Sequence, residues 1–162
     1  MIPFSGLKLG FHDFEYAVGD AFFEAFDASE ITKGDFEVQV QLNKHETMLE
    51  FEFAMKGTVE TQCDRCTEAL SIELAGDQRL IVKFGAESYD QTDEIIVIPD
   101  TDYEINIAQY IYEFLHLLLP SKRVHAEGEC NEEIIAKLHS LSRSDDEEDD
   151  IDPRWAALKG IK

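Results

Sequence analysis

Cysteine is scarce in this chain: only three occur among 162 residues, and one CxxC with an odd cysteine left over makes a poor disulfide framework. A reducing cytoplasm is therefore the expected location. The longest aliphatic runs, at residues 95–98 and 117–119, are far too short to cross a bilayer. The first five residues contain neither a basic region nor an apolar core, so no secretory signal is visible.

Basic residues are also scarce, because 14 Lys and Arg stand against 35 Asp and Glu and give a net charge of −21. Residues 145–152 hold seven of the acids, so the rest of the chain still carries −14. Such a field repels phosphate backbones, whose neutralisation supplies most sequence-independent nucleic-acid binding. The charge favours basic protein partners; alternatively, it only keeps the chain soluble.

Signatures of catalysis are missing as well. The sequence shows no nucleophile paired with a base, no glycine-rich phosphate loop and no pair of carboxylates that would form a cleft. An enzymatic activity is therefore not expected. The composition does supply a core: 44% of the residues are hydrophobic and eleven are Phe, enough for one well-buried domain at this length.

Apolar and polar residues alternate along much of the chain from residue 35, which predicts half-buried antiparallel strands. A hairpin turn is expected at 43–46, and Gly57 is expected to break or bulge the strand that follows. Residues 1–30 are mixed, and 20–26 could form a short helix or an aromatic strand. The predicted strands are 36–42, 49–55, 59–63, 70–74, 80–84 and 95–98.

A helical spacing replaces the alternation at residues 107–119, with Asn106 as a cap and Pro120 as the stop. A second helix is expected from about residue 131 to residue 141. Residues 144–152 are too acidic to pack and predict a flexible linker. The Asp-Pro pair that follows predicts a short C-terminal helix over 153–162.

These patterns predict an α+β fold in which an antiparallel β-meander, which could be barrel-like, packs against one long apolar helix. Short C-terminal helices complete it. We expect residues 1–143 to form a single globular domain, followed by the acidic linker at 144–152 and the helical segment at 153–162.

Two pairs of soft ligands are the clearest candidate site. Cys63 and Cys66 form a CxxC on a turn after a strand, and His125 with Cys130 follows the apolar helix in a loop that could fold back over it. Four such ligands suit one structural Zn²⁺ in a closed tetrahedral site. Alternatively, the cysteines are small core residues. A redox role is a third interpretation, but it would need the CxxC at a helix N-terminus.

Five residues are candidates for partner contacts: Arg65, Lys122, Arg123, Trp155 and Leu158. Arg65 should project from the turn between the cysteines, where it could bind a partner or pair with an acid of this chain. Lys122 and Arg123 form the only adjacent basic pair. Trp155 and Leu158 share a face of the terminal segment, which could bind a partner or dock on its own sheet. Direct RNA binding would require one patch that joins Arg65, Arg79, Lys83, Lys122 and Arg123.

The order of these motifs resembles the YceD family of large ribosomal RNA subunit accumulation proteins. The resemblance rests on Cys63-Asp64-Arg65-Cys66 after a strand, a helix ending in Leu119-Pro120, and His125 with Cys130 beyond it. An acidic stretch and the terminal segment from Asp152 to Lys159 also match. The similarity runs from about residue 35 to the end, while residues 1–30 match only loosely.

The resemblance implies a bacterial or organellar role in the accumulation of 23S rRNA, and hence in assembly of the large ribosomal subunit. Family members are typically encoded beside a small basic protein of that subunit. We therefore expect a non-enzymatic, cytoplasmic factor that contacts a basic ribosomal protein or a pre-ribosomal particle, with rRNA contacts that are indirect and no membrane. The alternatives are a direct rRNA-binding module and a zinc-stabilised scaffold whose acidic linker and Trp155 segment recruit a partner.

Overall fold

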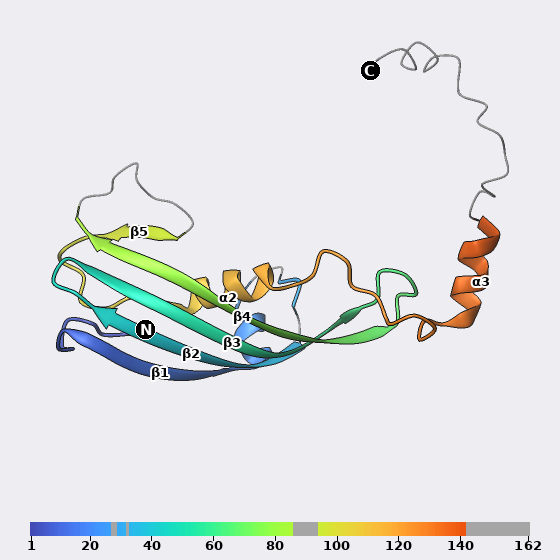
Figure 1. Ribbon diagram of the computed structural model, residues 1–162, viewed down its shortest axis with the longest axis horizontal. Helices are drawn as coiled ribbons and strands as arrows, with labels where there is room; N and C mark the ends of the chain where they lie inside the picture. The colour runs from blue at the N-terminus through green and yellow to red at the C-terminus, as the bar shows by residue number, and fades with distance from the viewer. Residues whose placement is uncertain (27–28, 32, 86–93, 142–162) are drawn as a thin grey trace, which may run out of the picture.

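The computed structural model describes residues 1–26, 29–31, 33–85 and 94–141 (Figure 1). Within these ranges the chain forms one five-stranded sheet and three helices, which confirms the α+β class. The predicted linker at 144–152 and the helical segment at 153–162 lie outside the described residues. No helix in the described ranges combines the length and apolarity that crossing a membrane requires.

The sheet has the strand order β1-β2-β3-β4-β5. Its first four strands pair antiparallel, whereas β5 pairs parallel with β4, so the sheet is mixed and the prediction of a wholly antiparallel sheet is wrong. The sheet is also open, and the barrel-like alternative is wrong: β5 has only four residues and offers little edge for closure on β1. The strands are β1 (Gly10–Val18), β2 (Lys33–Lys44), β3 (Met48–Gln62), β4 (Ala69–Phe84) and β5 (Ile95–Ile98).

Two of the strands are longer than predicted. β3 runs without a break through Gly57, which pairs with Phe36 on β2 and Leu74 on β4, so the predicted bulge is wrong. β4 likewise joins the two strands predicted at 70–74 and 80–84. Gly57 has a different role: a Cβ there would clash with the carbonyl oxygen of Asp35, so glycine allows the two backbones to approach closely.

The helices are short: α1 spans Asp20–Glu24, α2 spans Ala108–Leu117 and α3 spans Glu132–Leu141. The prediction of one long apolar helix is therefore wrong, since α2 has ten residues. Asn106 accepts a hydrogen bond from the N–H of Ala108 at 3.1 Å just before α2 begins. At the other end of α2, Leu119 precedes Pro120. The proline ring disfavours the α conformation in the residue before it, so the helix does not continue through Leu119.

Both α1 and α2 cover the same face of the sheet. The Phe114 ring of α2 lies 5.2 Å from that of Phe53 on β3, and the Phe23 ring of α1 lies 6.2 Å from that of Phe36 on β2. Phe114 is only 5% exposed, which confirms that α2 packs on the core through the predicted stripe. The alternate residues of β2, β3 and β4 point to the opposite face and are exposed.

The hairpin of β3 and β4 extends beyond the rest of the sheet, and α3 lies past its tip (Figure 1). No residue of α3 is buried. The tip has its own small apolar cluster, separate from the main core, formed by three buried cysteines with Leu70, Val124 and Ile135 packed around them. This tip is where the candidate site lies.

Candidate metal centre

The CxxC lies in the turn between β3 and β4, as its position after a strand predicted. The N–H of Cys63 donates to the carbonyl of Glu68 at 2.8 Å, and the N–H of Thr67 donates to the carbonyl of Cys63 at 2.8 Å. Thr67 adopts a left-handed backbone with φ of 61°, which tightens the turn. Cys63 and Cys66 are each only 1% exposed, so the turn holds both thiols on its inner side.

The second ligand pair comes from the loop between α2 and α3. Gly128 reverses this loop in a left-handed conformation with φ of 88°, which glycine adopts without strain. Asn131 then caps α3, because its Oδ1 accepts hydrogen bonds from the N–H of Glu133 at 3.0 Å and of Ile134 at 3.3 Å. The Asn131 amide also donates to Glu68 at 2.7 Å and so fastens the start of α3 to the CxxC turn.

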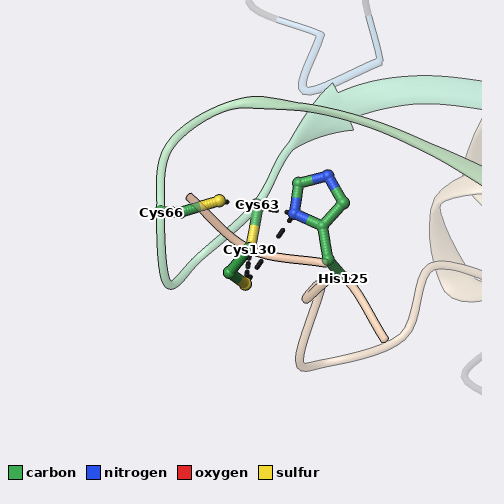
Figure 2. A group of neighbouring side chains, drawn as sticks. All are labelled: Cys63, Cys66, His125 and Cys130. Atoms are coloured by element: carbon green, nitrogen blue, oxygen red, sulfur yellow. Dashed lines mark hydrogen bonds between the residues drawn. The ribbon is translucent and has the colours of Figure 1, made fainter. Parts of the chain in front are cut away.

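The four predicted ligands converge, as Figure 2 shows. Their ligand atoms all lie within 4.8 Å of one another. The Sγ atoms of Cys63 and Cys130 are 3.8 Å apart, and Nδ1 of His125 lies 3.3 Å from Sγ of Cys66 and 3.9 Å from Sγ of Cys130. Sulfurs held about 2.3 Å from a tetrahedral zinc ion lie about 3.8 Å from each other. The geometry is therefore compatible with one zinc ion.

The orientation of His125 also fits a ligand. Its Nε2 lies 3.0 Å from the carbonyl oxygen of Ala69, which can only accept a hydrogen bond. That contact places the proton of the neutral imidazole on Nε2 and leaves the Nδ1 lone pair facing the three sulfurs. A ring N–H fixed by a backbone carbonyl is the usual outer contact of a metal-binding histidine.

The electrostatics of the cluster favour a thiolate at Cys63. Burial acts to raise the pKa of this thiol, but backbone N–H groups of Cys66, His125 and Arg65 point at the sulfur and together lower the pKa to about 6. Hydrogen bonding from the backbone of Asn131 likewise lowers the pKa of Cys66. Burial raises the pKa of Cys130, and the Ala69 carbonyl raises that of His125. Without a metal, these two groups hold their protons more firmly than usual.

Three cysteines and one histidine fill all four corners of a tetrahedron, so the arrangement is closed and offers no position for a substrate. The CxxC is on a strand-to-strand turn and not at a helix N-terminus, where a redox dithiol would be expected. All three cysteines are free thiols and buried, which also agrees with the interpretation as core residues. A core role alone, however, does not account for an imidazole nitrogen directed at the sulfurs.

The three basic residues among the predicted partner-binding residues lie within the described part of the chain, and the two apolar ones do not. Arg65 and Lys122 are exposed, whereas Arg123 is half-buried and its guanidinium pairs with Glu30 at 3.4 Å. Trp155 and Leu158 lie outside the described residues.

Sequence reasoning missed the contacts that hold the two ligand pairs together. Asp64 exchanges backbone and side-chain hydrogen bonds with Arg123, and the Ala69 carbonyl and Asn131 make the contacts described above. Only Asn131 carried a signal, because an Asn before an acidic first turn is typical of a helix cap. The others involve backbone groups or a partner 59 residues away.

The fold and the site define a small α+β protein with an open mixed sheet, whose longest hairpin ends in a closed Cys₃His cluster suited to a structural ion. The chain belongs to the YceD family, described as "Large ribosomal RNA subunit accumulation protein YceD", whose model matches residues 51–162. That range includes the whole cluster and most of the long hairpin. No curated protein and no solved structure matches the chain. The family name assigns the chain to accumulation of the RNA of the large ribosomal subunit.

Proposed function

We propose that this chain is a non-enzymatic, cytoplasmic factor in large-subunit biogenesis that supports accumulation of 23S rRNA through contacts with a basic ribosomal protein or an assembly intermediate. Its membership of the YceD family carries this proposal. The absence of any catalytic signature in the sequence supports a role through binding. The closed ligand set of the tip cluster also suits a structural part better than a reaction centre.

The net charge of −21 supports a protein partner over direct RNA binding. A field of this sign repels phosphates and accelerates the approach of a cationic protein, over a range set by the ionic strength. Proteins that bind rRNA are commonly basic, because they neutralise phosphates. An acidic factor can therefore occupy their cationic surface before the RNA does.

The arrangement of basic residues argues against the RNA-binding alternative. In the register of the sheet, Arg79 lies opposite Glu52 and Lys83 lies opposite Met48. Both are near the open end of the β3–β4 hairpin, far from its turn. Arg65 lies on the turn at the opposite end, about ten residues or roughly 33 Å further along the strand. The hydrogen bonding between Asp64 and Arg123 places Lys122 and Arg123 beside that turn. The five residues therefore do not form the single patch that direct RNA binding would require.

We also propose that Cys63, Cys66, His125 and Cys130 bind one structural Zn²⁺, supported by the convergence of their ligand atoms. The ion would fasten the loop before α3 to the hairpin tip. Arg65 and Lys122, exposed beside this site, are then held on a rigid surface where they can contact the particle, together with Arg123. Trp155 and Leu158 would add a short apolar contact of the terminal segment.

Low-salt copurification from growing cells tests the function. Tagged full-length protein should recover a large-subunit protein or precursor particle, and recovery of neither would contradict the proposal. Crosslinking before the pull-down, read for both protein and rRNA, separates protein contact from direct RNA contact. Truncation after Asp152 should reduce partner recovery without changing thermal stability if the terminal segment binds a partner. A clear loss of stability would instead indicate that this segment docks on its own domain.

A further inference from the structure

The face of the sheet opposite α1 and α2 contains a hollow of about 820 Å³ that crosses β1 to β4. Five carboxylates and one guanidinium line it, so its charge is strongly negative. The charged lining residues are Asp13, Glu15, Glu52, Asp77, Glu94 and Arg79.

The register of the strands explains the shape of the hollow. One cross-strand row runs Glu15, Gln39, Ala54, Asp77, so the small Ala54 side chain forms the floor between a carboxylate at each end. The next row runs Asp13, Gln41, Glu52, Arg79. All eight residues are exposed. A methyl group at the centre and longer polar side chains around it leave a depression with acidic walls.

The negative charge of the hollow is not neutralised from within the protein. Arg79 is occupied, because its guanidinium pairs with Glu50 at 2.9 Å. Asp13 accepts a hydrogen bond from Gln41 at 2.9 Å, which leaves its charge in place. Among the residues that the structure describes, Glu15, Glu52 and Asp77 have no ion pair and no side-chain hydrogen bond. The hollow therefore presents charge for which the described part of the chain supplies no counter-ion.

We propose that this hollow, lined by Asp13, Glu15, Glu52 and Asp77 with Ala54 as its floor, is the docking surface for an extended, Arg- and Lys-rich segment of a protein partner. The inference rests on the proposed function and says where the basic partner binds. Charge complementarity selects a cationic occupant, and the same charge excludes a nucleic acid. Acids that share one exposed face of a sheet repel each other at short range, and a cation between them relieves that repulsion.

The dimensions indicate the form of the occupant. Four neighbouring strands span about 14 Å, because adjacent strands lie about 4.8 Å apart. An extended segment rises about 3.3 Å per residue, so about four of its residues cross the hollow. Alternate side chains of such a segment face the sheet about 6.6 Å apart, so a cation near Glu15 and one near Asp77 are four residues apart, about 13 Å along the segment. A partner segment with basic residues at alternate positions fits this spacing.

Peptide binding by the full-length protein tests the surface. The probe is a fluorescein-labelled peptide of about twelve residues in which arginine and lysine alternate with glycine, long enough to cross the hollow at 3.3 Å per residue. Binding is followed by fluorescence anisotropy at low salt. The variant Glu15→Gln/Glu52→Gln/Asp77→Asn should weaken binding about tenfold, as expected for the loss of three exposed charge pairs.

A matched control separates this surface from the overall charge. Asp100→Asn/Asp102→Asn/Glu127→Gln removes the same number of exposed acids away from the hollow and should change the affinity less than about threefold. Ala54→Lys places a resident cation on the floor of the hollow and should reproduce the tenfold loss, whereas Ala136→Lys on the exposed side of α3 should not.

Three results would overturn the inference: equal losses in the hollow and control variants, retained affinity in Ala54→Lys, or no binding of the peptide by the unmodified protein. These results differ from failure of the proposed function. If the hollow variant still copurifies a large-subunit protein, the proposed surface is overturned and the proposed function is left intact. Peptide binding specific to the hollow, with no ribosomal protein recovered from cells, would support the surface and contradict the proposed function.

Discussion

Asp64 and Arg123, 59 positions apart, exchange two hydrogen bonds. The N–H of Asp64 donates to the carbonyl oxygen of Arg123 at 2.7 Å, and Oδ2 of Asp64 accepts from the N–H of Arg123 at 2.6 Å. Asp64 lies between Cys63 and Cys66, and Arg123 precedes His125 by two residues. The pair therefore aligns the two halves of the cluster by contacts that need no metal ion.

Replacement of Asp64 by Ala tests this alignment. The variant loses the side-chain bond to Arg123, and we expect its zinc affinity to fall about tenfold, as is typical when a residue that orients metal ligands is removed. Asp64→Asn keeps an acceptor oxygen and should retain most of the affinity. Competition with a chromophoric chelator measures the difference. Arg65→Ala is the matched control, because Arg65 is exposed on the same turn; an equal loss in both variants would contradict the role of Asp64.

The packing of α2 leads to a second prediction. Phe114 is 5% exposed against Phe53, whereas Leu117 on the same helix is 71% exposed. Phe114→Ala should lower the free energy of unfolding by about 3–5 kcal/mol, because it removes a buried ring and leaves a cavity. Leu117→Ala should stay within about 0.5 kcal/mol of the parent. Urea unfolding at pH 7 compares them, and similar losses in both would show that α2 does not pack as described.

The sequence predicted the half-buried strands well, because a strand with one face on the core alternates with period two. β1 escaped prediction because its sequence does not follow its burial: the exposed position of Phe11 is apolar and the inward position of His12 is polar, which breaks the alternation. The parallel pairing of β5 depends on which neighbour the chain returns to, and local pattern does not contain that information. The length of α2 was overestimated because the apolar stripe continues into Ile107 and Leu118, which flank the helix without belonging to it.

The convergence of the four candidate ligands was predicted correctly, because soft-ligand spacing is visible in the sequence. Their supporting contacts were not visible, since a backbone carbonyl such as that of Ala69 has no sequence signature. The acidic hollow was hidden for a similar reason. Its carboxylates come from strands that only the register aligns, and the chain carries acids almost everywhere.

Glu50 supports a prediction about pH. Its carboxylate lies 3.1 Å from His45 and 2.9 Å from Arg79, and the hydrogen bond from His45, with help from Arg79, holds its pKa below the usual value of 4.5. A lowered folded-state pKa contributes stability that is present above the unfolded pKa and lost as the pH falls. Glu50→Gln should therefore destabilise the protein at pH 7, by less than about 1 kcal/mol because the site is near the surface.

That difference should shrink on acidification from pH 7, as the pH falls through the lowered folded pKa and the carboxylate of the parent protein becomes protonated as well. Urea unfolding at neutral and at acidic pH measures it. Glu73→Gln on the exposed face of β4, which has no ion pair among the described residues, should have little effect at either pH. A Glu50→Gln penalty that grows on acidification would contradict the assignment.

The separation of the two buried clusters determines what metal removal should do. Among the described residues, the hydrophobic side chains that pack on Cys63, Cys66 and Cys130 are those of Leu70, Val124 and Ile135, and none of these belongs to the main core. Protein purified without chelator should contain about one zinc per chain. Stripping the ion with a strong chelator should unfold the tip locally. The Asp64–Arg123 bonds align the two halves of the cluster, but these bonds and the few apolar contacts there stabilise the loop and α3 too little to hold them without the ion.

Hydrogen exchange followed by mass spectrometry resolves this outcome. After chelation, amides in residues 63–68 and 121–141 should exchange much faster, while those of the central strands β2 and β3 before Gln62 should keep their protection. Cys63→Ser/Cys130→Ser should show the same pattern without chelator, and added zinc should restore protection only in the parent protein. Loss of protection across the whole sheet would mean that the tip and core are one cooperative unit. No change anywhere would mean that the cysteines are ordinary core residues and the metal proposal is wrong.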